Sequence, residues 1–254
     1  MSETDSSATQ KTAEKPALEE AVHSQSPEIL LSAARDPALT EELALALLKH
    51  PELPASVIES LSKNGVLLKQ RKIRLAVASH PRTPRHVSLP LLRHLYTFDL
   101  MYLALTPVVP ADVKKAGDEA LVTRLGTVSS GEKLSLARRA SGRIAEQLLL
   151  EKEPRIMEAA LENPRLTEMS IVKALMRADA SAAFVQAVCH HGKWSQRREV
   201  RVALLRNEKT PLARALEFAQ SFSVAILKEI LNNSRLPAAT KSSLLNNKTI
   251  ARSQ

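Results

Sequence analysis

Aromatic residues are scarce in this chain: they make up 3% of its 254 residues. We also find no sustained alternation of apolar and polar residues bounded by hairpin turns, which argues against a protein built from β-strands. The six glycines are scattered singly, so the sequence has no glycine-rich loop of the kind that cradles phosphates. With 44% hydrophobic residues available for a continuous core, these absences predict an all-α protein.

Long apolar runs and cysteine are lacking as well. No segment approaches the roughly 18 apolar residues that cross a membrane, and no early run has the length of a signal-peptide core. The single cysteine, Cys189, cannot form an internal disulfide, which fits a reducing compartment. We therefore expect a cytoplasmic protein with no membrane span.

What the sequence does contain is a recurring five-residue segment, which we call a joint and number from position 1 to position 5. Its clearest copy is residues 80–84 (HPRTP). Ile73 and Val77 lie on one face of a helix before this copy, and Pro81 disfavours helical geometry at the preceding residue. The Thr-Pro pair at positions 4 and 5 is typical of a new helix start. The joint therefore predicts a helix end followed at once by a second helix.

The joint recurs along the chain with consistent chemistry. Position 5 is always Pro or Thr, and ten of the twelve prolines after residue 30 fall at positions 2 or 5. The residue three before position 1 is always apolar. The seven copies begin at Asp36, His50, His80, Thr106, Asn163, Asn207 and Asn233.

The spacing of the joints predicts the fold. Intervals of 26 and 30 residues suit a pair of helices, and the intervals of 57 and 44 predict weaker copies near residues 125–131 and at His190. In the first of these, Ser129 and Glu132 match a capping box. A helix pair cannot bury its apolar face alone and must stack on its neighbours. We expect an α-solenoid of stacked short helical repeats with proline-marked joints over residues 28–254, preceded by a disordered acidic tail at residues 1–27.

Three segments of the chain, ASHPRTPRHV, ENPRLTEMSI and LRNEKTPLAR, resemble the leucine-rich repeat variant, a bacterial HEAT-like α-solenoid family. In that family an Asn-Pro-x-Thr-Pro-like joint follows an apolar run. The resemblance covers residues 28–254 and implies a HEAT-like solenoid. Some family members carry an iron–sulfur cluster on an N-terminal cysteine group, and the lone Cys189 does not supply one.

Charge is distributed unevenly. Residues 1–30 hold two lysines and six acidic residues, a net of −4, so the rest of this +9 chain carries +13. Residues 60–98 contain eight basic residues and no acidic one, and a second basic cluster surrounds the joint at Asn207. Position 3 is basic in four copies, which predicts a cationic ridge along one edge of the stack. We assign partner binding to Lys69, Arg71, Lys72, Arg74, Arg82, Arg85, Arg165, Arg197, Arg198, Arg201, Lys209 and Arg235.

This basic surface has more than one interpretation. Position 3 follows a helix C-terminus, where cations are favoured by the helix dipole without any partner. If the charges do serve binding, then acidic protein surfaces, nucleic-acid phosphates or anionic lipid would each complement them. We predict a non-enzymatic scaffold that holds an acidic protein partner, with nucleic-acid binding through phosphate contacts as the alternative. A third hypothesis is that the acidic tail competes for the same surface.

Candidate chemistry is sparse. Cys189 and the two histidines after it are consecutive, and consecutive helical residues project about 100° apart, so they cannot converge on one metal ion. Ser60 and Lys63 have a spacing found in acyl-transfer enzymes, but the companion motifs are missing. Trp194 could anchor a partner or fill an irregular joint. We predict no enzymatic activity, no metal and no cofactor.

Overall fold

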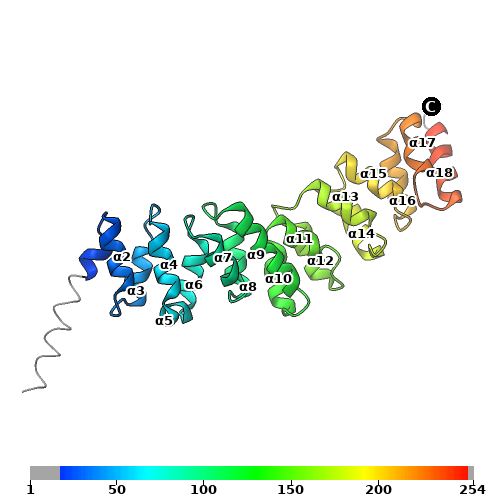
Figure 1. The fold of residues 1–254 in the computed structure, drawn as a ribbon. Coiled ribbons are helices and arrows are strands. Elements are labelled where there is room, and N and C mark those ends of the chain that lie inside the picture. Colours follow the sequence, from blue (N-terminus) through cyan, green and yellow to red (C-terminus); the bar gives the residue numbers. More distant parts are fainter. Residues whose placement is uncertain (1–17, 251–254) are drawn as a thin grey trace, which may run out of the picture. The chain divides into compact units, whose positions relative to one another are not determined.

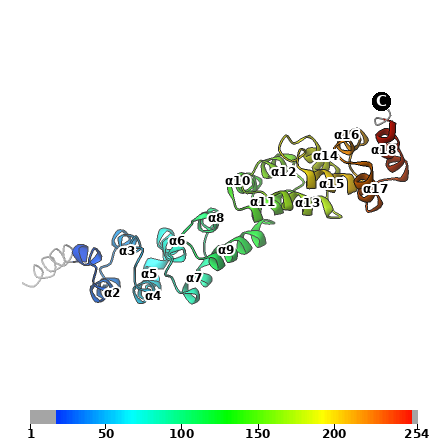
Figure 2. The same ribbon diagram turned by 90° about the horizontal axis from the view of Figure 1, so that it is seen from above.

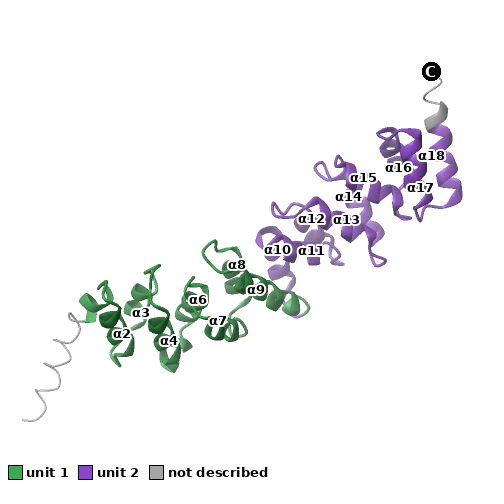
Figure 3. Cartoon of the chain, turned by 45° about the horizontal axis from the view of Figure 1, so that its top comes forward, with its two compact units in different colours: residues 1–126 green, residues 127–254 purple. Residues whose placement is uncertain are grey.

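The computed structural model describes residues 18–250, with side chains described as far as residue 247. This part of the chain consists of helices and turns and contains no strand, which confirms the all-α prediction (Figure 1). It divides into two compact units, residues 1–126 and residues 127–254, where the sequence predicted one continuous solenoid (Figure 3).

Unit 1 is a solenoid-like stack of two helical layers (Figure 2). Within one layer, helix α2 packs on α4 and α7 packs on α9; within the other, α3 packs on α6 and α6 on α8. Successive helices are joined by short turns. The helices are α2 (Pro27–Arg35), α3 (Glu41–Leu47), α4 (Ala55–Lys63), α5 (Gly65–Lys69), α6 (Arg71–Ser79), α7 (Arg85–Leu92), α8 (Thr97–Leu105) and α9 (Ala111–Arg124).

Unit 2 repeats this plan with a regular alternation. Helices α10, α12 and α14 pack side by side, as do α11, α13, α15 and α17, and α16 packs on α18. The helices are α10 (Ser130–Arg139), α11 (Gly142–Leu148), α12 (Pro154–Leu161), α13 (Glu168–Met176), α14 (Ala182–His190), α15 (Arg198–Arg206), α16 (Leu212–Gln220), α17 (Val224–Asn232) and α18 (Ala238–Ile250).

Position 5 of the joint is the residue that caps the next helix. The Thr40 and Thr167 hydroxyls accept backbone N–H groups of α3 and α13. In other copies Pro takes the place of Thr, because its φ near −60° already suits the entry to a helix. The sequence had suggested Thr83, at position 4, as a cap. Instead Pro84 is the N-cap of α7, and the buried Thr83 hydroxyl donates to the carbonyl of Val77 at 2.6 Å.

In the four copies that begin at His50, His80, Asn163 and Asn207, position 1 ties the joint to the repeat before it. The His80 Nδ1 accepts the N–H of Arg82 at 3.2 Å, so Nε2 carries the proton and donates to the carbonyl of His50 at 2.9 Å. Asn163 does the same with an amide: Oδ1 accepts the N–H of Arg165 at 2.8 Å, and Nδ2 donates to Ala137 at 2.7 Å. Histidine and asparagine are interchangeable here because both offer one donor and one acceptor.

Two positions at and before the joint are buried in all seven copies. The apolar residue three before position 1 is buried in every copy, as the sequence predicted. Position 4, which the sequence did not single out, is buried as well. Position 4 is occupied by Leu39, Leu53, Thr83, Val109, Leu166, Thr210 and Leu236. Each joint therefore buries one side chain of its own in the core.

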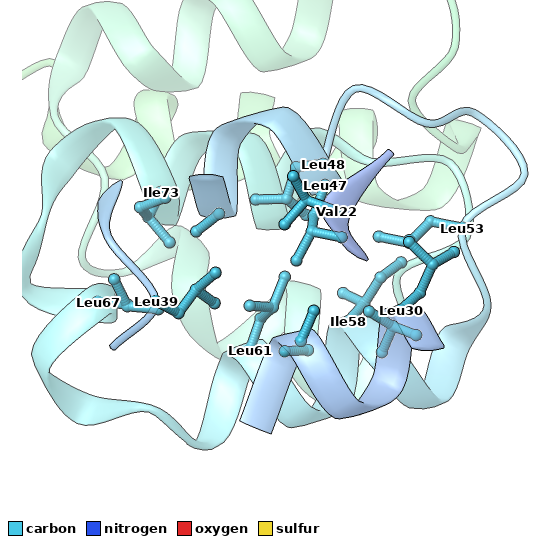
Figure 4. Packing of buried hydrophobic residues seen from close by; sticks show 14 of the residues in the cluster. Val22, Leu30, Leu39, Leu47, Leu48, Leu53, Ile58, Leu61, Leu67 and Ile73 are labelled. Carbon is cyan, nitrogen blue, oxygen red and sulfur yellow. The ribbon is translucent and has the colours of Figure 1, made fainter. Parts of the chain in front are cut away.

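The N-terminal boundary of the folded chain lies earlier than predicted. Residues 18–22 are helical, and Leu18 and Val22 are buried in the core of unit 1 (Figure 4). The carbonyl of Val22 accepts a hydrogen bond from His50 Nε2 at 3.0 Å. This segment is thus part of unit 1 and not of a tail ending at residue 27. Residues 1–17 of the predicted tail lie outside the described residues.

The two weak copies inferred from the long intervals are resolved differently. Ser129 and Glu132 form the expected capping box at the start of α10. In the other, α14 continues through His190, and His191 is position 1: its Nδ1 accepts the N–H of Lys193 at 3.2 Å. The sequence register was therefore wrong by one residue, because Gly192 stands where Pro usually marks position 2.

Candidate binding groove and basic surface

A groove runs along the joint edge of unit 1, where α3, α6 and α8 end side by side. Its volume is about 460 Å³. One wall is a face of α6 on which apolar and polar residues recur at positions i, i+3, i+4 and i+7. The lining residues are Leu48, Lys49, Pro51, Lys72, Leu75, Ala76, Ser79, His80, Pro81, Tyr102, Thr106 and Val108.

Helix α6 supplies this wall because it has two apolar faces. Ile73 and Val77 are fully buried between the layers. Leu75 and Ala76 lie on the adjacent face, are only half-buried and border the groove. An amphipathic helix packed on one side leaves its second apolar stripe available to another molecule.

The charge of the groove is positive. Lys49 and Lys72 are exposed at its rim, and no acidic residue lines it. The side-chain ammonium groups of both lysines lack a hydrogen-bond or ion-pair partner in the described part of the chain. His80 does not add to this charge, because burial lowers its pKa below the ordinary 6.5 and favours the neutral ring. Tyr102, 57% exposed, presents an aromatic surface at the same place.

Arg71, which the sequence assigned to partner binding, forms an ion pair between two helices. Its guanidinium donates to both carboxylate oxygens of Asp99, with Nε to Oδ2 at 2.9 Å and Nη2 to Oδ1 at 2.7 Å. The Asp99 side chain is only 5% exposed, so the pair joins α6 to the start of α8. The same guanidinium lies 5.1 Å from the ring centre of Tyr96.

Two further arginines of the acid-free run also find carboxylates on neighbouring repeats. Arg82 pairs with Glu52, at position 3 of the preceding joint. Arg85 on α7 pairs with Asp112 on α9, with Nε to Oδ2 at 2.7 Å. A run without acids in the sequence is therefore not a surface without acids, because stacking brings in carboxylates from 27 to 30 residues away.

Of the remaining predicted residues in unit 1, Lys69 and Lys72 are exposed and have no partner in the described part of the chain. Arg74 is half-buried on α6, and its Nε is buried without a hydrogen-bond partner. Only Lys72 reaches the groove. The sequence missed Lys49 and Tyr102, and the signal that could have found the groove was the second apolar stripe of α6.

In unit 2 the position 3 cations lie on two edges instead of forming one ridge. Three helices, α13, α14 and α15, separate the joint at Asn163 from the joint at Asn207. Because these consecutive helices run in opposite directions, the three of them place the two joints at opposite edges of the stack. Arg165 therefore reaches the carbonyl of Arg139, whereas Lys209 donates to the carbonyl of Ala180 at 2.6 Å.

Among the other predicted cations of unit 2, some side chains contact the rest of the chain and others do not. Arg201 is half-buried; its Nε donates to the carbonyl of Ser195 at 2.7 Å, and its guanidinium lies over Phe218. Arg197 and Arg198 are exposed and unpaired in the described part of the chain. Arg235 is exposed, and its backbone N–H donates to Arg206.

Trp194 fills a joint, which was one of the two predicted roles. It is 2% exposed, and its indole N–H donates to the carbonyl of Leu161 at 2.8 Å. Cys189 is fully buried, and burial raises the pKa of its thiol to about 11. Tyr96 and Tyr102 are both exposed.

Within residues 18–250 no helix is long and apolar enough to cross a bilayer. No protein-family model, no curated protein and no solved structure matches this chain.

Proposed function

We propose that this protein is a non-enzymatic binding scaffold and that the groove of unit 1 holds an acidic, amphipathic segment of a protein partner. One observation carries this proposal. The groove combines an apolar wall on α6 with two unpaired lysines, and no carboxylate lines it. A segment with apolar residues on one face and carboxylates beside them would satisfy both features. The resemblance to the leucine-rich repeat variant and the cytoplasmic location remain predictions.

The pairing of the basic residues favours a protein partner over nucleic acid. Three of the eight cations in residues 60–98 are held by carboxylates from neighbouring repeats. A phosphate backbone needs a row of available cations, since its affinity comes from neutralising several charges at once. A protein segment needs fewer charges and gains from the apolar wall, which a phosphate backbone cannot use.

The proposal can be tested by fluorescence anisotropy with a defined probe. The probe is a labelled helical peptide with leucines on one face and glutamates beside them, and the matched control peptide carries glutamine in place of glutamate. We expect the acidic peptide to bind the full chain and to weaken with added salt, because exposed charges are screened. The double variant Lys49→Gln, Lys72→Gln should bind about tenfold more weakly, as two rim ion pairs are lost.

A matched variant makes the result specific. Lys115 is exposed on α9 in the same unit and lies outside the groove, so Lys115→Gln should bind as the wild type does. Arg71→Glu is not a suitable probe, because it would leave the buried Asp99 unpaired and disturb α8. Equal affinity of the two peptides, or equal loss in the Lys115 variant, would overturn the proposal. Tighter binding of duplex DNA or structured RNA, with a steep salt dependence, would favour the alternative.

A further inference from the structure

Unit 2 contains a small basic hollow of its own. It has a volume of about 40 Å³ and is partly open to solvent. Its walls come from three turns that lie at the same edge of the stack, after α13, α15 and α17. The basic residues that line it are Arg177, Arg206, Lys209 and Arg235.

The fold brings these cations together and holds them there. Helices α13, α15 and α17 pack side by side, so the turns that follow them are neighbours. Asn207 Nδ2 donates to the carbonyl of Leu175 at 2.7 Å, which ties the second turn to the end of α13. The N–H of Arg235 donates to the carbonyl of Arg206 at 2.9 Å, which ties the third turn to the second. The hollow is therefore a fixed feature of the backbone.

Positive charge prevails around the hollow. Glu208 lines it, and Asp179 is held by Arg177 through two hydrogen bonds of 2.8 and 2.7 Å. Arg177 lowers the pKa of Asp179, with a contribution from Lys209, so this carboxyl is ionised. At the hollow four cations thus stand beside the carboxylates of Glu208 and Asp179, and the carboxylate of Glu146 acts on Arg177 as well.

Donors at this place lack acceptors. The Nε of Arg206 is buried and has no hydrogen-bond partner. The guanidinium of Arg235 is exposed and makes no hydrogen bond or ion pair in the described part of the chain. A buried N–H group without an acceptor is unfavourable, and an anion oxygen would remove that cost.

We propose that this hollow binds a phosphoryl group carrying two negative charges, either as free inorganic phosphate or as a phosphoserine side chain. Guanidinium groups match tetrahedral oxyanions through paired N–H donors, and three arginines line the hollow. A phosphoryl dianion offers three acceptor oxygens to these donors, whereas a carboxylate offers only two. The site is independent of the proposed groove, since it lies in the other unit and uses none of the same residues.

A competing role for these cations is to offset the carbonyl ends of α13, α15 and α17, where helix dipoles favour positive charge. Lys209 has a structural contact of its own, since its ammonium donates to the carbonyl of Ala180 in the turn between α13 and α14. The two roles make different predictions. Cations that serve only the helix ends would affect stability when replaced but would bind no phosphate.

Isothermal titration calorimetry on the full chain can decide between them. The ligand is inorganic phosphate, and a chloride titration at equal ionic strength corrects for general screening of this +9 protein. We expect a phosphate dissociation constant of about 1 mM or lower, with no saturable signal for chloride. Arg235→Gln should weaken phosphate binding by about tenfold, because one charge-assisted contact is lost.

The control variant is Arg198→Gln, because Arg198 is equally exposed in unit 2 and does not line the hollow. It should bind phosphate as the wild type does. A short phosphoserine peptide, compared with its serine form, identifies the source: binding of both phosphate and phosphopeptide indicates a phosphoprotein ligand, and binding of phosphate alone indicates the free ion. Absence of binding at 10 mM phosphate (about −2.7 kcal/mol), or an equal loss in both arginine variants, would overturn the proposal.

Discussion

The replacement Asn163→Ala tests whether position 1 holds the repeats together. Asn163 is fully buried and makes three hydrogen bonds, with Nδ2 to Ala137 and Ala140 at 2.7 and 3.2 Å and Oδ1 to the N–H of Arg165 at 2.8 Å. Alanine leaves these backbone groups without their partner. Each unmet buried group costs about 1–3 kcal/mol, and partial access of water to the turn reduces the sum, so we expect a loss of about 3 kcal/mol.

The assay is urea denaturation followed by circular dichroism and by fluorescence. Trp194 is the sole tryptophan and donates to Leu161, two residues before Asn163, so its emission reports on this joint. With an m-value of about 2–3 kcal/mol/M, the midpoint should fall by about 1–1.5 M. Asn233→Ala is the control, because Asn233 has the same position but is exposed and makes one 3.4 Å bond within its own helix. Equal midpoints for the two variants would refute the reasoning.

Three further predictions concern the glycines of unit 2, His80 and Cys189. Gly142→Ala should destabilise unit 2 by about 1–3 kcal/mol, because the new Cβ would lie 2.4 Å from the carbonyl oxygen of Arg165. Gly131→Ala should stabilise unit 2 by about 0.5–1 kcal/mol, because Gly131 lies on α10 with open space around it. The urea midpoints of the two variants test both expectations. Burial lowers the pKa of His80, so between pH 6.5 and that lowered pKa the unfolded chain binds more protons than the folded chain. The free energy of unfolding should therefore decrease as the pH is lowered through this window. His80→Asn, which keeps a donor and an acceptor, should remove this pH dependence from denaturation curves. Because the Cys189 thiol is buried and its pKa is raised to about 11, it should react slowly with a thiol reagent at pH 8 and rapidly in denaturant; a fast reaction in the folded chain would contradict its burial.

The helix ends, the helix starts and the buried positions near them could be predicted from the sequence, because each depends on residues that are adjacent in the chain. Proline at position 2 ends one helix, Pro or Thr at position 5 begins the next, and the apolar residue three before position 1 is buried. The prediction failed where these marks are missing. Gly192 replaces the expected proline, so the joint was placed at His190 instead of His191.

The candidate site was harder to predict because it depends on contacts between repeats. Asp99 and Asp112 neutralise Arg71 and Arg85 from 28 and 27 residues away, and composition alone does not reveal such pairs. The single ridge failed for a geometric reason: an interval of 44 residues holds an odd number of helices and moves the next joint to the other edge.

The hydrogen bonds of position 1 give the array a direction. His80 donates to the repeat that contains His50, His50 donates to Val22, and Asn163 and Asn207 likewise donate to helices earlier in the chain. The repeats that carry these four joints thus need acceptors on their N-terminal side. During synthesis the required carbonyls have already left the ribosome when each new joint emerges, so a repeat can dock without waiting for later sequence. Loss of a repeat from the C-terminal side exposes carbonyls that water can satisfy, whereas loss from the N-terminal side strands buried donors.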